Sequence, residues 1–102
     1  MNKQMRETSI QAYESLNPTQ TQKLREHIYH LLRLNPMTDE ELLEALGGEQ
    51  YYSPSGVRAR RSELVKDERF LDMRVYDSGV RRKTKFGKNT IVWTTTPQGS
   101  LL

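Results

Sequence analysis

The sequence predicts an α+β fold in which helices precede a β-hairpin, and three observations support it. Residues 17–34 and 38–46 begin with helix-start signals and carry apolar residues at helical spacing. A further helix is predicted from residue 53, where Ser53 suits the N-cap and Pro54 the first helical position. After residue 79, two short strand-like segments at 80–85 and 90–95 flank a turn at 86–89. This is the layout of a winged helix-turn-helix, with a three-helix core, an extra N-terminal helix and a C-terminal β-hairpin wing.

The length of 102 residues favours one domain. We expect an N-terminal arm and short helix at 1–16, the main domain at 17–96 and a flexible tail at 97–102. Hydrophobic residues make up only 34% of the chain, so the core must be small. No window is apolar enough to span a membrane, and residues 1–6 lead into no secretory signal. The chain has no cysteine, which excludes disulfides and fits a reducing cytoplasm.

The N-terminal helix is predicted from a capping pattern formed by Thr8 and Gln11. It would be too short to persist alone in water, so it must dock on the domain or on a second copy of the chain. Its apolar stripe consists of Ile10, Tyr13 and Leu16.

The first long helix should start at Asn17 and Pro18 and end near Leu34, because the residue before Pro36 is pushed out of helical geometry. The residues expected on its core face are Leu24, Ile28, Leu31 and Leu32.

The second helix has the clearest start, a capping box in which Thr38 and Glu41 exchange hydrogen bonds. Three acidic residues at 39–41 suit the positive end of the helix dipole, which favours a structural role for them over a metal site. Gly47 and Gly48 supply the stop, since glycine readily adopts the left-handed conformation.

On the third helix, at about 100° per residue, Leu64 lies about 20° and Arg61 about 40° from the core residue Val57. We therefore expect Arg61 to face the core and to pair with Glu41 or Glu44. The opposite face carries Ser55, Ala59, Ser62 and Lys66, with Arg58 at one edge and Arg60 nearer the core.

Charge is divided unevenly along the chain, whose net charge is +3. Residues 1–52 carry 5 basic and 8 acidic residues, whereas residues 53–88 carry 11 basic and 5 acidic ones. A basic helix and hairpin match the electrostatic footprint of a phosphate backbone. The other interpretation is a solvated basic face.

The predicted function is double-stranded DNA binding by a recognition helix (53–67) and a basic wing (80–93). Arg58 is the best candidate to read a base, because arginine can bond both guanine acceptors in the major groove. Serines at a helix start can bond phosphate, although Ser53 and Ser55 could equally serve only as caps. On the wing, Arg81, Lys83 and Lys85 alternate, with Lys88 at the turn; protection of an edge strand is the alternative role. The predicted contacts are Ser53, Ser55, Arg58, Ala59, Arg60, Ser62, Lys66, Arg81, Lys83, Lys85 and Lys88.

Catalysis is not predicted. The sequence lacks nucleophile-elbow, P-loop, dinucleotide-binding and zinc-protease motifs. His27 and His30 are spaced to chelate a metal, but no further His or Cys could complete the site. We expect neither a metal nor a cofactor. Trp93 is expected in the core rather than stacked on a base.

Five segments together resemble small winged-helix proteins encoded by bacteriophages and prophages. They are TSIQAY at 8–13, MTDEEL at 37–42, VRARRSELV at 57–65, GVRR at 79–82 and TIVW at 90–93. The resemblance covers roughly residues 8–95. It implies a DNA-binding fold of phage origin. We further expect the protein to act in the cytoplasm of a bacterial host, as a regulator of transcription or in another phage DNA transaction.

The alternative is a winged-helix interaction module that binds a host protein, with the acidic first half of the chain as its surface. RNA binding is less favoured because no aromatic platform is visible. The sequence leaves monomer and homodimer open.

Overall fold

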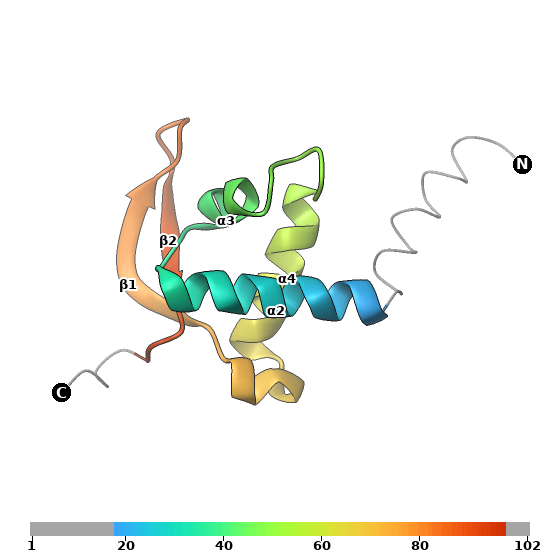
Figure 1. The fold of residues 1–102 in the computed structure, drawn as a ribbon. Helices are drawn as coiled ribbons and strands as arrows, with labels where there is room; N and C mark the ends of the chain where they lie inside the picture. Colours follow the sequence, from blue (N-terminus) through green and yellow to red (C-terminus); the bar gives the residue numbers. More distant parts are fainter. Residues whose placement is uncertain (1–17, 98–102) are drawn as a thin grey trace, which may run out of the picture.

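The computed structural model describes residues 18–97, and these form the predicted α+β arrangement (Figure 1). Helices α2 (Pro18–Leu34), α3 (Asp39–Ala45) and α4 (Pro54–Lys66) are followed by the 3₁₀ helix η1 (Glu68–Met73) and by strands β1 (Tyr76–Lys83) and β2 (Asn89–Thr94). The predicted N-terminal helix and its apolar stripe lie outside the described residues, as does the tail beyond Pro97. No helix among residues 18–97 is long and apolar enough to cross a membrane.

The core lies where α2, α3 and α4 meet the hairpin. The predicted face of α2 is confirmed, with Leu31 only partly buried and the other three positions buried. Val57 and Leu64 bring α4 into the same core, and Trp93 brings in β2 as expected. The buried core residues are Leu24, Ile28, Leu32, Leu42, Leu46, Val57, Leu64, Val75 and Trp93.

Residues close to each end of α3 determine where the helix begins and ends. The Thr38 hydroxyl accepts from the Glu41 amide at 3.2 Å, and the Glu41 carboxylate accepts from the Thr38 amide at 3.0 Å. This confirms the capping box. At the other end Gly47 and Gly48 have φ of 112° and 91°, and their amides bond Glu44 and Leu43 carbonyls. This is the predicted left-handed stop.

Helix α4 begins as predicted. Ser53 is the N-cap, its hydroxyl accepts from the Gly56 amide at 3.0 Å, and Pro54 is the first helical residue. Ser55, the other candidate cap, lies inside the helix. After α4 the chain forms η1, a 3₁₀ helix that was not predicted from the sequence.

The hairpin differs from the prediction in its first strand. β1 begins at Tyr76, four residues before the predicted start of the strand at residue 80. The pairing with β2 is antiparallel and irregular between Asp77 and Arg81. The Asp77 carboxylate accepts from the amide of Gly79, whose φ is 85°. The turn-forming residues thus make a bulge within the strand, because both features use the same local hydrogen bonds.

A single residue extends the hairpin toward the helices. Met37, between α2 and α3, exchanges both backbone hydrogen bonds with Trp93, at 3.1 and 2.8 Å. It acts as a third strand reduced to one residue. The described order is therefore α2, the one-residue strand at Met37, α3, α4, η1 and the hairpin of β1 and β2.

Candidate nucleic-acid interface

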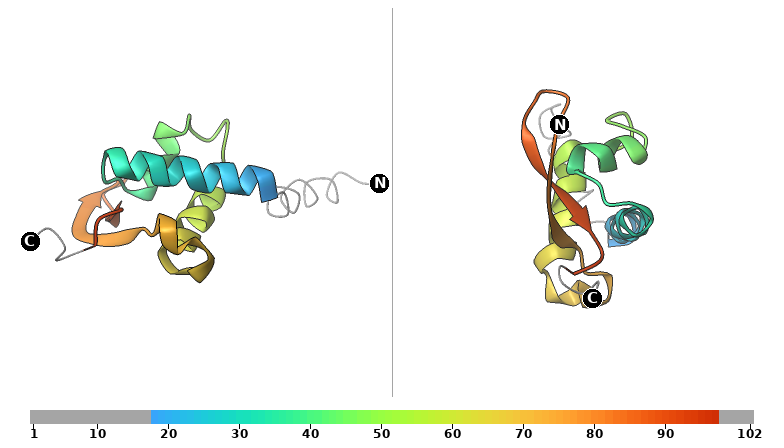
Figure 2. Two further views of the ribbon diagram at one scale, coloured as in Figure 1. Left: turned by 60° about the horizontal axis from the view of Figure 1, so that its bottom comes forward. Right: turned by 90° about the vertical axis from the view of Figure 1, so that its left-hand side faces the viewer.

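Helix α4 and the hairpin lie on the same side of the domain. In the right-hand view of Figure 2, α2 is seen along its axis at one side, and the hairpin and α4 lie on the other side. The basic segment of the sequence is thereby gathered on the side away from α2.

The outward face of α4 is polar and partly cationic. Ser55, Arg58 and Lys66 are exposed, while Ala59 and Ser62 are half-buried. The Arg58 guanidinium and the Lys66 ammonium make no ion pair or side-chain hydrogen bond within residues 18–97. These side chains lie where the helical spacing placed them, opposite Val57 and Leu64.

Arg60, another predicted contact, is held inside the molecule. Its guanidinium donates to both Glu63 carboxylate oxygens, at 2.9 and 3.2 Å, and its side chain is only 14% exposed. Arg25 of α2 donates to the same carboxylate at 2.9 Å and stacks on Phe70. This three-residue group ties α2 to α4, so Arg60 is poorly placed to reach DNA.

Arg61 faces inward as expected, but its partner is Asp39 rather than Glu41 or Glu44. Two hydrogen bonds of 2.8 and 2.6 Å join the guanidinium to the carboxylate. The guanidinium carbon also lies 4.0 Å from the centre of the Trp93 ring. Asp39 is the first residue of α3, and the packing of α3 against α4 directs that end of α3 toward Arg61.

The hairpin cations fall into two groups. Arg81 pairs with Asp77 of its own strand at 3.0 Å, and Arg82 pairs with Glu41 of α3. Lys83 and Lys88 are exposed and make no ion pair within residues 18–97. Of the predicted hairpin contacts, Arg81 is therefore already paired with a carboxylate of its own strand.

Lys85 does not share a strand face with Arg81 and Lys83, contrary to the predicted alternation. β1 ends at Lys83, and Thr84 begins the turn. The Lys85 amide donates to Glu40 of α3 at 3.3 Å, while its side chain stays exposed near Phe86. The alternation failed because the turn covers residues 84–88 and so begins two residues earlier than the predicted 86–89.

Two carboxylates on this side are held in their charged form. Burial raises the pKa of Glu41, but hydrogen bonds from Arg82 and Thr38 outweigh it and hold that pKa below its usual value. The Gly79 amide and Arg81 lower the pKa of Asp77. The acidic start of α3 is thus engaged by the molecule's own cations: Asp39 by Arg61 and Glu41 by Arg82.

Replacing Ser53 by alanine should lower the free energy of unfolding by about 0.5–2 kcal/mol, because the Gly56 amide loses its cap. Urea denaturation of the variant against wild type measures this change. Ser55→Ala is the matched control, since Ser55 lies inside the helix and caps nothing. Equal stabilities for the two variants would contradict the assignment of Ser53 as the cap.

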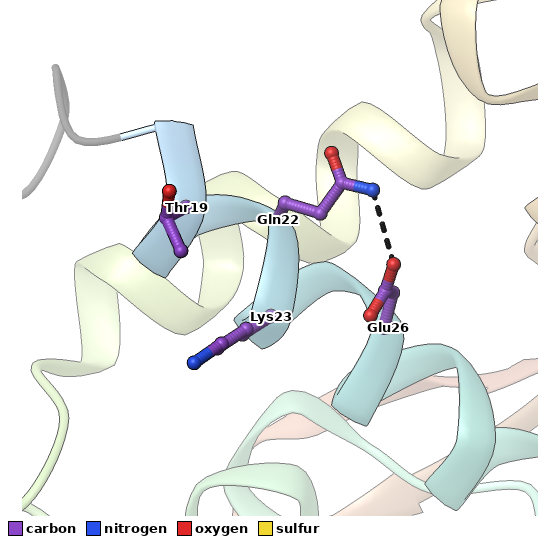
Figure 3. Close-up of a pocket in the computed structure, with 4 residues that line it drawn as sticks. All are labelled: Thr19, Gln22, Lys23 and Glu26. Carbon is purple, nitrogen blue, oxygen red and sulfur yellow. Dashed lines mark hydrogen bonds between the residues drawn. The ribbon is translucent and has the colours of Figure 1, made fainter.

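A shallow pocket lies on the surface of α2. Thr19, Gln22, Lys23 and Glu26 line it, all from α2, and the Gln22 amide donates to Glu26 at 3.0 Å (Figure 3). Within residues 18–97 no three His, Cys, Asp or Glu side chains gather to hold a metal ion. His27 and His30 are both exposed.

The exposed cations of α4 and the hairpin are Arg58, Lys66, Arg81, Arg82, Lys83, Lys85 and Lys88. Comparison of the chain with protein-family models, curated proteins and solved structures finds no match. The function is therefore best inferred from these side chains and from the order of the elements.

Proposed function

We propose that this protein binds double-stranded DNA as a winged helix-turn-helix, with α4 in the major groove and the hairpin beside it. The observation that carries the proposal is Arg58, an exposed arginine on the outward face of α4 whose guanidinium pairs with no carboxylate of residues 18–97. The element order supports it, because a helix, a short strand, two helices and a hairpin make up a winged helix-turn-helix. The placement of α4 and the hairpin on one side adds to that support (Figure 2).

The chemistry of the α4 face suits a groove. A guanidinium can donate two parallel hydrogen bonds to guanine O6 and N7, which few other side chains can do. The small Ala59 permits close approach of the helix to the bases. Ser55, Ser62 and Lys66 are suited to phosphate oxygens on either side.

The hairpin supplies attraction without sequence preference. Lys83 and Lys88 carry charge that no internal carboxylate neutralises, and each could replace a condensed counterion on the backbone. Arg81 contributes less, because Asp77 already neutralises it. We leave Arg60 out of the proposed contacts because Glu63 holds it.

A regulatory role in transcription, or in another phage DNA transaction, is part of this proposal and follows from the sequence resemblance. Binding of a host protein through the acidic first half is less well supported. Asp39 and Glu41, which would belong to that surface, already pair with Arg61 and Arg82.

Arg58→Ala should weaken binding to a preferred duplex by about 1–3 kcal/mol and leave binding to random duplex nearly unchanged. Lys83→Ala should weaken both alike and lower the slope of log affinity against log salt by about one. The preferred duplex is obtained by selection from a random pool, and fluorescence anisotropy at several salt concentrations measures both effects.

Arg33→Ala is the matched control, because Arg33 is exposed and belongs to α2 rather than to α4 or the hairpin. It should bind like wild type on both duplexes. Equal losses on preferred and random DNA for Arg58→Ala would remove its role as base reader. Failure of wild type to bind any duplex would overturn the whole proposal.

A further inference from the structure

The turn of the hairpin carries the most exposed large hydrophobic side chain among the described residues. Phe86 is 85% exposed, although phenylalanine normally contributes to a core. It makes no contact with the buried cluster. Figure 1 shows the turn between β1 and β2 projecting past α3, and Phe86 belongs to this turn.

The backbone of the turn that carries Phe86 is held by four hydrogen bonds within residues 84–88. The Thr84 amide donates to the Lys88 carbonyl at 2.8 Å, and the Gly87 amide donates to the Thr84 carbonyl at 2.9 Å. Gly87 has a φ of 83°, which glycine adopts without strain. The Thr84 hydroxyl accepts from the amides of Phe86 and Lys88, both at 3.2 Å. The ring is therefore presented on an ordered turn.

The turn is also fixed to the body of the domain. The Lys85 amide donates to Glu40, and Arg82 pairs with Glu41, so both contacts reach the first turn of α3. These two contacts hold the turn against α3, so a side chain on the turn could insert into a partner without displacing the hairpin.

The positive charges around the Phe86 ring favour an anionic partner. Lys85 lies with its ammonium 5.5 Å from the ring centre, and Lys88 follows two residues later; both are exposed. An apolar ring between two cations fits a polyanion whose apolar surface lies between rows of phosphate. Base steps in the DNA minor groove have that character, and apolar side chains inserted there unstack the step and kink the duplex.

We propose that Phe86 is a wedge that inserts between base pairs in the minor groove and bends the DNA, with Lys85 and Lys88 on the flanking phosphates. This inference rests on the proposed DNA binding and adds a second activity to it. Flexible pyrimidine–purine steps such as TA are expected at the wedge position, because they unstack most easily. The protein would then act on the shape of its site as well as on its sequence.

The test is a bending measurement on the full chain. A duplex selected from a random pool by the wild-type protein carries a donor and an acceptor fluorophore at its two ends. We expect wild type to bend it by at least about 20°, seen as increased energy transfer. Phe86→Ala should abolish the bend and weaken binding about 5- to 100-fold, whereas Phe86→Leu should retain much of both, since leucine also serves as a wedge.

The controls separate the wedge from folding and from DNA binding itself. Phe86→Ala should keep the melting temperature of wild type, because the ring packs against no core residue. Leu71→Ala removes another exposed apolar side chain, 65% exposed in η1, and should bend DNA like wild type. Binding without bending, unchanged in Phe86→Ala, overturns the wedge alone. No binding by wild type overturns the DNA-binding proposal and the wedge together.

Discussion

Replacing Leu64 by alanine is expected to lower the free energy of unfolding by about 2–5 kcal/mol. Leu64 is fully buried on α4 and belongs to the core that joins α4 to α2 and α3. Alanine is the better helix former, so the loss would come from packing and from the cavity left behind, rather than from the helix itself. Urea denaturation followed by the fluorescence of Trp93, the chain's single tryptophan, measures it.

Leu71→Ala provides the matched control, because the same atoms are removed from a side chain that is 65% exposed. Its unfolding free energy should change by no more than about 0.5 kcal/mol. Small domains are typically stable by only about 5–15 kcal/mol, so Leu64→Ala could leave part of the population unfolded. Leu64→Met conserves the volume and should cost less than about 1.5 kcal/mol. Similar losses for Leu64→Ala and Leu71→Ala would contradict the placement of Leu64 in the core.

Short-range signals made much of the fold predictable. The capping box of Thr38 and Glu41, the Gly47 stop and the Ser53 cap each act within about one helical turn of their own position. Helical spacing likewise identified the inward residues of α2 and α4, because one face of each helix has to be buried. Features decided by a few neighbouring residues could be read directly from the chain.

Features that depend on contacts between residues far apart in the sequence could not be predicted. Arg25 and Glu63 meet across 38 positions, and Arg82 and Glu41 across 41. The Arg60–Glu63 pair is itself a local contact at i,i+3 spacing, but the Arg25 contact that links this pair to α2 depends on how the two helices pack. The one-residue bridge of Met37 to Trp93 has the same origin, since it depends on how the hairpin packs on the helices.

The hairpin illustrates a local signal with two possible outcomes. Asp77 and Gly79 form the hydrogen bond of a turn in either case. Whether the chain reverses there or continues as a bulged strand depends on β2, which pairs on both sides of the irregularity, at Asp77 and at Arg81. The candidate interface changes accordingly, because Asp77 is brought onto Arg81 and neutralises one predicted contact.

Removing the Arg61 side chain is expected to cost about 3 kcal/mol of unfolding free energy, the lower end for a broken buried ion pair. The guanidinium is 11% exposed at the side-chain level, bonds Asp39 twice and lies over Trp93. Arg61→Ala would leave the Asp39 carboxylate without its partner and the Trp93 ring without its cover. The cost should not reach the upper end, since Asp39 is 29% exposed and sits at the start of α3, where the helix dipole favours a negative charge.

A double-mutant cycle with Arg61→Ala and Asp39→Ala would isolate the pair, and we expect a coupling energy of about 0.5–3 kcal/mol. Arg58→Ala is the matched control on the same helix, three residues earlier and exposed; its unfolding free energy should stay within about 0.5 kcal/mol of wild type. The two variants should therefore give opposite results in the stability and DNA-binding assays. Arg61→Ala should weaken the fold, and its DNA affinity, measured where the variant is fully folded, should stay close to that of wild type. A stable Arg61→Ala variant that has lost DNA binding would place Arg61 at the interface and contradict its inward orientation.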